Sequence, residues 1–320
     1  MAQTGIERAG APRQDATIGR PSRLQLWWKE VKKHKQSYAL MSPYMLLFFL
    51  FTVLPVVMAI VIGFTYFNLL EFPKWVGWHN YTRLFLEDDV FLTAVKNTFL
   101  FAGITGPISY MMCFVFAWLV NELKPKTRAI MTLFFYAPSI SGNVFFIWKI
   151  IFSGDRYGFL NGFLLNLGVI NDPIQFLRDE RYVLWIVLLV QLWLSLGVSF
   201  LAFIAGLQTI DRSLFEAGAV DGIKNRWQEL WFITLPSMRP QLLFGAVMQI
   251  TASFAVADVS TQLAGFPSVN YAAHTVVTHL EDYGTIRFEM GYASAIATVL
   301  FVIMVGANVV VQKLLRKVGE

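Results

Sequence analysis

Apolar residues dominate six long stretches of this chain, and shorter polar segments separate them. Each stretch has about 20 or more residues, the length that an α-helix needs to cross a hydrocarbon core of roughly 30 Å. None alternates apolar and polar residues over about 10 positions, as the strands of an outer-membrane barrel do. The pattern predicts six transmembrane helices, over Tyr44–Phe67, Val95–Val120, Ala129–Phe152, Val183–Leu207, Leu242–Ala264 and Met290–Leu314.

Composition supports an all-α membrane protein. Only 15% of the residues are charged, against about 25% in a typical soluble domain. The single cysteine, Cys113, lies inside the second apolar stretch, so no disulfide and no cysteine-based metal site is expected within the chain. His274 and His279 are five residues apart, whereas helical metal ligands are usually four apart. We therefore expect no metal site.

The distribution of Lys and Arg predicts the orientation in the membrane. The residues before Tyr44, those from Lys313 onward and the loops 121–128 and 208–241 hold 18 of the 26 basic residues. Because short cytoplasmic segments are enriched in Lys and Arg, both termini and both loops are expected in the cytoplasm. No folded basic domain is present in the pattern, so nucleic-acid binding is not expected.

The same pattern predicts the domain organisation. Residues 1–28 have no periodic apolar pattern and are expected to form a flexible cytoplasmic tail. Residues 29–43, rich in Lys and preceded by Trp27 and Trp28, are expected to be an interfacial amphipathic segment. The transmembrane domain follows over 44–314, with the long loop 208–240 inside it, and 315–320 form a second cytoplasmic tail. Between spans on the outer side, the apolar stretch Phe159–Leu167 is expected to form a short helix on the outer face.

Polar side chains interrupt the predicted spans. Because a carboxylate at membrane depth is costly, Asp258 is expected either to bond to a neighbouring helix or to line a transport pathway. These two interpretations stay open on the residues alone. The other polar residues at membrane depth are Ser141, Asn143, Gln191, Ser195, Gln249, Ser253 and Gln262.

The loop segment Glu216–Pro236 predicts a compact elbow between two spans. Ser213 and Glu216 have capping-box spacing, which predicts a helix over about Leu214–Val220. Asp221-Gly222 predicts a turn, Arg226–Ile233 a second amphipathic stretch, and Pro236 its end. Such an elbow can transmit movement between membrane helices or can lie on the bilayer surface, and both interpretations stay open.

Glu216-Ala217, Gly222 and Ile233-x-Leu235-Pro236 resemble the EAA loop of the permease subunits of binding-protein-dependent ABC importers. This pattern is long and specific. Two departures are visible. Gly218 stands where the family often has a second alanine, and ten residues separate Gly222 from Ile233 where nine are usual.

The resemblance extends over roughly residues 40–315 and is to the sugar permeases within that family. It is carried by Pro138-Ser-Ile-Ser141, Trp148-Lys149, Gly158-Phe-Leu-Asn161, Phe254-x-x-x-Asp258 and Met290-Gly-Tyr-Ala-Ser-Ala295. The chain looks like the first of two different permease subunits. Residues 263–270 replace the usual glycine-rich tract, which is a departure near the outer mouth.

This resemblance implies a type I ABC importer permease fold in a bacterial or archaeal cytoplasmic (inner) membrane, forming half of the pore for a sugar or oligosaccharide. It implies four partners besides membrane lipid: a second, different permease, two cytosolic ABC ATPase domains, an extracytoplasmic solute-binding protein and the sugar. No G-x-x-x-x-G-K-[ST] loop occurs. ATP and Mg are therefore expected on the partner ATPase, with no cofactor and no catalytic residue in this chain.

The resemblance also implies two groups of functional residues. The ATPase-coupling group is Glu216, Ala217, Gly218, Asp221, Gly222, Ile233, Leu235 and Pro236. The substrate-pathway group is Tyr136, Ser141, Gln191, Ser195, Phe254 and Asp258, whose amides, hydroxyls and aromatic faces suit a sugar. Each pathway residue also has a packing interpretation.

Two other classes of function are alternatives. An ion-coupled secondary transporter would need intramembrane charge, and Asp258 is the one acidic residue deep in a predicted span. A membrane enzyme acting on glycans or lipids would need paired acidic groups or a metal. Its one dense candidate is Glu87-Asp88-Asp89, and a solvated acidic loop explains that segment adequately.

Overall fold

The computed structural model describes residues 30–142 and 144–317, and the chain divides into two compact units between Val57 and Met58. The predicted flexible tail 1–28 and residues 318–320 lie outside the described residues. Residues 315–317, predicted to belong to the second tail, continue the last helix, which ends at Lys317.

The first unit is the beginning of a long apolar helix. It contains α2 (Lys35–Phe48), a π-helical turn (Phe49–Val53) and the first residues of α3 (Leu54–Ile62). The predicted first span, Tyr44–Phe67, therefore ends too late, because the helix stops at Ile62. Residues Thr65–Tyr66 instead form strand β1.

The second unit opens with a small hairpin and a short helix. Strand β1 pairs antiparallel with β2 (Lys74–Trp75), and α4 (His79–Leu86) follows. Asn80 anchors the hairpin, because its buried side-chain amide donates to the carbonyls of Gly63 (2.9 Å) and Thr65 (2.8 Å).

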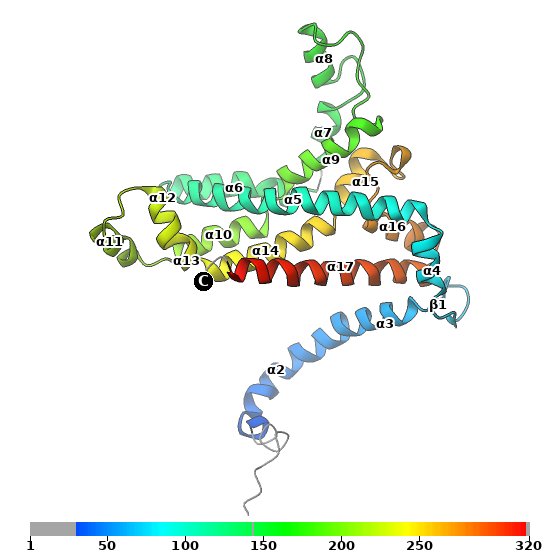
Figure 1. The fold of residues 1–320 in the computed structure, drawn as a ribbon, viewed down its shortest axis with the longest axis horizontal. Coiled ribbons are helices and arrows are strands. Elements are labelled where there is room, and N and C mark those ends of the chain that lie inside the picture. The colour runs from blue at the N-terminus through cyan, green and yellow to red at the C-terminus, as the bar shows by residue number, and fades with distance from the viewer. Residues whose placement is uncertain (1–29, 143, 318–320) are drawn as a thin grey trace, which may run out of the picture. The chain divides into compact units, whose positions relative to one another are not determined.

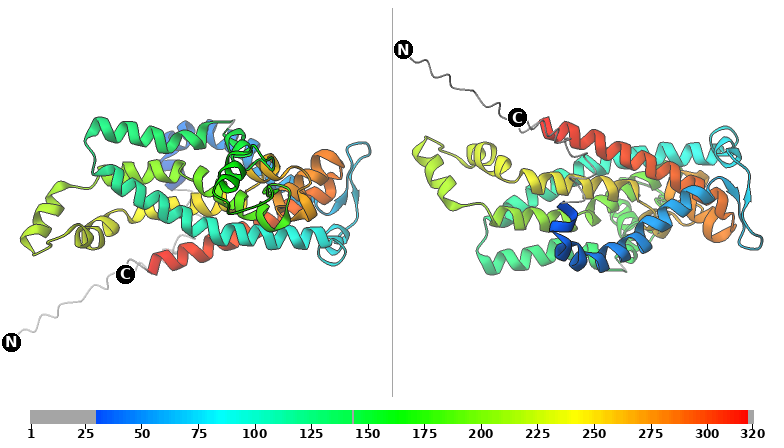
Figure 2. Two further views of the ribbon diagram at one scale, coloured as in Figure 1. Left: turned by 90° about the horizontal axis from the view of Figure 1, so that it is seen from above. Right: turned by 90° about the horizontal axis from the view of Figure 1, so that it is seen from below.

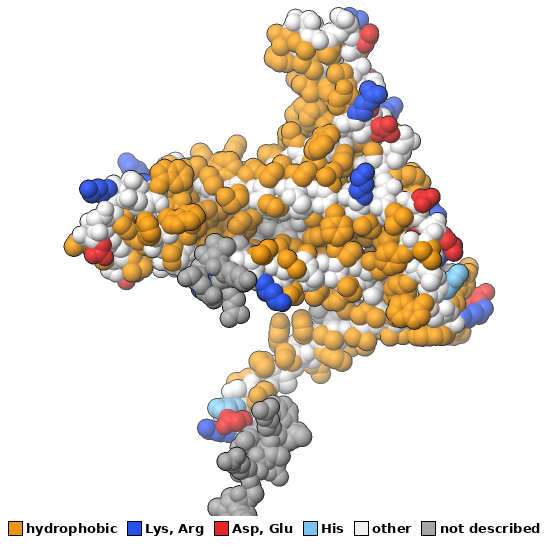
Figure 3. All heavy atoms as spheres, viewed as in Figure 1, with side chains coloured by type: hydrophobic (Ala, Val, Ile, Leu, Met, Phe, Trp, Pro, Cys, Tyr) orange, Lys and Arg blue, Asp and Glu red, His pale blue; other side chains and the backbone are white. Residues whose placement is uncertain are grey.

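Helix α5 (Asp89–Asn121) is the central element of the second unit, and α10, α14 and α17 lie alongside it or beside one another (Figures 1 and 2). Three groups of buried side chains follow its length, around Phe91, Phe101 and Phe114. Apolar side chains cover much of the surface along α5 and α17, and charged ones gather at the α11 and α4 ends (Figure 3). Burial of apolar area between these helices and apolar exposure around them is what a lipid-embedded bundle requires.

Five helical stretches among the described residues are long and apolar enough to cross a membrane: Lys35–Ile62, Asp89–Asn121, Glu180–Gln208, Arg239–Ala264 and Met290–Leu314. A sixth span exists if α6 (Pro125–Ile140) and α7 (Phe145–Ile151) count as one, and these two are bent by 84°. The predicted all-α membrane fold is confirmed, with five or six candidate spans where six were predicted. Three of the predicted spans are broken helices.

The remaining elements connect and interrupt these spans. The predicted short helix at Phe159–Leu167 is confirmed as α8. The bounds are α8 Phe159–Asn166, α9 Glu180–Leu194, α10 Val198–Gln208, α11 Arg212–Val220, α12 Arg226–Glu229, the π-helical turn Leu230–Thr234, α13 Leu235–Ser237, α14 Arg239–Phe254, α15 Asp258–Ala264, the 3-10 turn Val269–Tyr271, α16 Val276–Glu281, the π-helical turn Asp282–Ile286 and α17 Met290–Lys317.

Candidate functional site

Three spans of the second unit are interrupted, and the interruptions meet at one cavity. The breaks separate α6 from α7, α9 from α10, and α14 from α15. Non-helical backbone at membrane depth is tolerated where it is buried in protein or lines a water-filled space. The cavity has a volume of about 550 Å³ and is lined by residues beside all three breaks, among them Ser141, Gly142, Gln191, Ala255 and Asp258.

A smaller hollow of about 170 Å³ shares Gln191, Leu194 and Ala252 with this cavity. Gln249 lines it from α14, and the Ser199 hydroxyl donates to the Gln249 side-chain oxygen at 3.2 Å. The Ser109 hydroxyl also lines it, is buried, and has no hydrogen-bond partner among the described residues. The two hollows together offer hydroxyls, amides and a carboxylate, which are groups that exchange hydrogen bonds with sugar hydroxyls.

Four of the six predicted pathway residues come together here. Ser141, Gln191 and Asp258 line the larger cavity, and Ser195 lines the smaller one. Asp258 is exposed at the first turn of α15 and lines the larger cavity. Its role in a transport pathway stays a prediction.

The other two predicted pathway residues lie elsewhere. Phe254 is buried, makes an edge contact with Phe99 (ring centroids 5.8 Å apart), and lines a separate apolar hollow of about 510 Å³. Tyr136 is absent from the lining of every hollow described here, although Pro138 of the same helix lines the main cavity. Ser109 was not predicted as a pathway residue, because a single serine inside an apolar stretch is also common in packed membrane helices.

The elbow begins with α11, but its cap differs from the prediction. Asp211 is the N-cap residue, and its carboxylate accepts from the Ser213 amide at 3.0 Å. The predicted capping box at Ser213 and Glu216 is therefore wrong, and the helix starts at Arg212 rather than near Leu214. Asp211 provides the same acceptor two residues earlier. The predicted turn is confirmed, since α11 ends at Val220 and Asp221-Gly222 forms the turn that follows. Gly222 has φ +95°, a region that favours glycine.

Gly218 is the contact between α11 and the second half of the elbow. A Cβ at this position would lie 2.7 Å from Ile233 Cδ1 and 3.0 Å from Ile223 Cδ1. The residue that departs from the family alanine thus lies against Ile233. The ten residues between Gly222 and Ile233 therefore still return the Ile233 side chain to the Gly218 backbone. Glu216, Ala217 and Asp221 are exposed on the other faces of α11.

Pro236 does not end the helix that contains it, contrary to the prediction. Helices α12, α13 and α14 follow one another from Arg226 to Phe254, interrupted by the π-helical turn Leu230–Thr234 and a single turn residue, Met238. The Met238 amide still donates to the Thr234 carbonyl at 3.0 Å. A π-helical turn just before the proline loosens the backbone where the ring would clash with the preceding turn.

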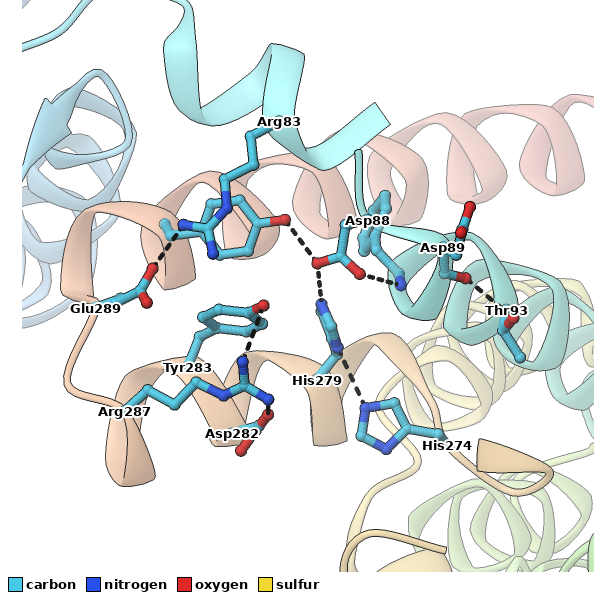
Figure 4. A network of polar contacts seen from close by, with 12 residues as sticks. Arg83, Asp88, Asp89, Thr93, His274, His279, Asp282, Tyr283, Arg287 and Glu289 are labelled. Carbon is cyan, nitrogen blue, oxygen red and sulfur yellow. Dashed lines mark hydrogen bonds and ion pairs between the residues drawn. The ribbon is translucent and has the colours of Figure 1, made fainter. Parts of the chain in front are cut away.

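The acidic segment Glu87-Asp88-Asp89 is not simply a solvated loop. Asp88 caps α5 by accepting from the Phe91 amide (2.9 Å), and it also lies 3.0 Å from His279 Nε2 and accepts from the Tyr292 hydroxyl at 2.7 Å (Figure 4). Burial alone would raise the pKa of Asp88, but the hydrogen bonds from His279, the Phe91 amide and Tyr292 outweigh it and lower this pKa below its usual 3.8.

The two histidines that were set aside as metal ligands extend this network. His279 Nδ1 lies 3.2 Å from His274 Nε2, and both side chains are buried. Burial lowers the pKa of His274 to about 4. With His279 Nε2 donating to Asp88, its Nδ1 can accept from His274 Nε2. The network therefore joins α16 and α17 to the start of α5, which is a structural role and not that of an enzyme's acid pair.

Comparison with known proteins gives the class. No protein-family model matches the chain. The probable ABC transporter permease protein YesP of Bacillus subtilis (strain 168) is 33% identical over 279 residues, which are 85% of this chain and 88% of that protein. The arabinooligosaccharides transport system permease protein AraP of the same organism is 26% identical, over 91% of this chain and 92% of that protein. The lactose transport system permease protein LacF of Rhizobium radiobacter is 29% identical, over 82% of this chain and 87% of that protein.

A solved structure shares the fold. The crystal structure of a bacterial ABC transporter involved in the import of the acidic polysaccharide alginate has a TM-score of 0.73 at 22% identity, covering 92% of this chain and all of that one. Broken membrane helices around a polar cavity, together with these similarities, define a multi-pass membrane transport protein. The chain belongs to the ABC transporter permease family. It is accordingly a transporter subunit that is not itself catalytic, and the ion-coupled and enzymatic alternatives are set aside.

Proposed function

We propose that the chain is the permease subunit of an importer for a sugar or oligosaccharide, and that it forms half of the pore. The cavity at the three helix breaks carries this proposal, because its hydroxyl, amide and carboxylate groups suit a polyhydroxylated cargo. The names of the similar permeases, which refer to arabinooligosaccharides and lactose, support the cargo class.

Within this proposal α11 is the helix that docks on a cytosolic ABC ATPase. Its exposed side chains include charged Glu216 and Asp221 beside apolar Leu214 and Val220, which are 46% and 88% exposed. Exposed apolar side chains rimmed by charge are typical of a protein-binding surface. The basic loops support a cytoplasmic location for this end of the bundle and for both termini.

The remaining partners follow from the same assignment. A second, different permease would complete the pore beside the main cavity. Two ATPase domains would supply the energy, with ATP and Mg bound on them, and an extracytoplasmic solute-binding protein would deliver the sugar. A related transporter has been crystallised with an alginate pentasaccharide-bound periplasmic protein, which supports the last of these partners.

Transport by the reconstituted complex tests the proposal. Proteoliposomes containing the chain with its second permease and ATPase, supplied with ATP and the sugar-loaded binding protein, should accumulate labelled sugar. The double variant Glu216→Ala with Gly222→Leu should abolish this uptake while the protein remains in the membrane, and the neighbouring control Lys224→Ala should transport normally. Normal uptake by the double variant with ATPase still required would refute the docking role of α11. Uptake that survives ATPase inactivation but collapses with the ion gradient would refute the ABC mechanism.

A further inference from the structure

Arg226, at the start of α12, joins the elbow to the end of the central helix α5. Its guanidinium lies 3.0 Å from the Glu122 carboxylate, directly after α5, and 2.7 Å from Glu229, one turn further along α12. Next to this ion pair, Trp227 of the elbow contacts Trp118 of α5, with ring centroids 5.5 Å apart. Two contacts of different kinds therefore connect the same two segments.

The backbone around Arg226 is fixed by its neighbours. The Asn225 side chain caps α12 by accepting from the Gln228 amide at 2.9 Å, and the Gln228 side chain accepts from the Lys224 amide at 2.8 Å. This reciprocal capping holds the turn that precedes the helix. Arg226, as the first residue of α12, is thereby held close to Glu122.

The two segments that Arg226 joins both lead to the cavity. From Arg226 the helices α12, α13 and α14 run for about 40 Å to Phe254, and Gln249 and Ala252 on this line border the smaller hollow. Helix α5 contributes Thr105 and Ser109 to the same hollow. Figure 2 shows the elbow at the same end of the bundle as the turn between α5 and α6. Between them is a hollow of about 540 Å³, lined among others by Glu122, Arg128, Glu216 and Arg226.

The ion pair cannot be explained as a contribution to stability. The side chains of Arg226 and Glu122 are 63% and 41% exposed, and exposed pairs of this kind contribute between zero and about 1 kcal/mol. A contact that adds little to the folded state can still decide which segments move together.

We propose that Arg226 is a positioning residue for coupling: it clasps the elbow to the end of α5, so that a displacement of α11 by the ATPase enters the bundle through α5 as well as through α14. This inference rests on the proposed docking role of α11. It extends the coupling apparatus to Glu122 and Trp118, which lie outside the EAA loop.

A double-mutant cycle on the whole reconstituted transporter tests the clasp. Glu122→Ala and Arg226→Ala should each lower the sugar transported per ATP hydrolysed by about threefold to tenfold, and the double variant should be no worse than either. Membrane levels and copurification with the second permease and the ATPase should stay unchanged, as should transport by the control Lys124→Ala in the same turn. Additive losses, or an unchanged ratio of transport to hydrolysis in both single variants, would overturn the clasp.

The same assay separates failure of the clasp from failure of the proposed function. If α11 does not dock on the ATPase, Glu216→Ala with Gly222→Leu leaves uptake intact. If α11 docks and only the clasp is wrong, that double variant is inactive while the Glu122 and Arg226 variants show additive effects or none.

Discussion

Asp88 and His279 are 191 residues apart in sequence, and their side chains meet at 3.0 Å in a nearly solvent-free site. This contact places α16 against the first turn of α5, and the Tyr292 hydroxyl adds α17. A second layer surrounds it, with Arg83 2.7 Å from Glu289 and 4.3 Å from the centre of the Tyr292 ring (Figure 4). The end of the bundle at which α5 and α17 begin is thus held by buried polar groups as well as by apolar packing.

Removal of the Asp88 charge should destabilise this end of the protein. Asp88→Ala leaves the buried His279 N–H and the Tyr292 hydroxyl without their acceptor and also removes the cap of α5. Each buried donor left unpaired costs about 1–3 kcal/mol. Asp88→Asn retains capping ability, so its loss should be smaller. Thermal unfolding of the detergent-solubilised protein, followed by fluorescence, measures both. The exposed neighbour variant Asp89→Asn should melt like the parent, and equal melting of Asp88→Ala and the parent would contradict the role of the pair.

Acid should weaken the same network. Burial lowers the pKa of His274 from 6.5 to about 4, so the unfolded chain takes up this proton more readily than the folded one. The contribution of neutral His274 is complete above about pH 6.5 and is lost as the pH falls from there toward 4. The lowered pKa of Asp88 adds a further loss at pH values below its ordinary 3.8. We expect the melting temperature to fall over pH 6.5 to 4, and His274→Gln to flatten this fall. His79→Gln, an exposed histidine variant, should leave the pH profile unchanged, and an identical profile in His274→Gln would refute the assignment.

Sequence periodicity predicted the membrane class and the number of spans but not the breaks within them. A break at Gly197 or at Ala255 replaces a few helical hydrogen bonds with contacts from other helices, such as the donation from Gln249 to the Ser195 carbonyl at 3.5 Å. Those contacts depend on which helices are neighbours, which local apolar content does not encode. Gln191 and Asp258, which the resemblance implies in the substrate pathway, line the main cavity. Phe254, implied with them, packs in an apolar core beside Phe99.

In the elbow too, features set by neighbouring residues could be predicted from the sequence, and features set by contacts between distant segments could not. The turn at Gly222 could be read from Asp-Gly chemistry, because it is a local preference. The cap at Asp211 was missed because Ser213, two positions later, matches the capping-box spacing with Glu216. Which of the two residues caps the helix depends on where the preceding helix ends. The joining of Asp88 to His279 could not be predicted, since neither residue's neighbours in sequence indicate the partner.

The close approach of Ile233 to Gly218 predicts a steep dependence on side-chain size. Gly218→Ala should transport within about twofold of the parent, because the nearest atom is the flexible end of the Ile233 side chain and small enlargements can be absorbed there. Gly218→Leu should uncouple transport, because a larger side chain displaces α11. Sugar uptake and ATP hydrolysis in proteoliposomes measure both effects. Ile233→Ala combined with Gly218→Leu should recover part of the uptake, and failure of any rescue together with normal protein levels would argue against this contact.

The position and hydrogen bonds of Gln249 predict how much its removal lowers sugar uptake. Gln249 borders the smaller hollow, and its removal takes away a polar group available to the cargo. The buried Ser199 hydroxyl keeps a partner, because it lies 3.2 Å from the Gly245 carbonyl as well as from the Gln249 side-chain oxygen. Gln249→Ala should therefore reduce sugar uptake by about fivefold, the effect of losing one hydrogen bond of about 1 kcal/mol to the cargo. Thr251→Ala is the matched control, because Thr251 lies on the same helix, is exposed, and bonds only to its own helix at the Val247 carbonyl. Concentration dependence of uptake, measured with saturating ATP and binding protein, distinguishes a pathway role from loss of protein. Equal losses in the Gln249 and Thr251 variants would remove Gln249 from the pathway, whereas a loss confined to Gln249→Ala at unchanged membrane level places the cargo beside α14 and the break at Ser195–Gly197.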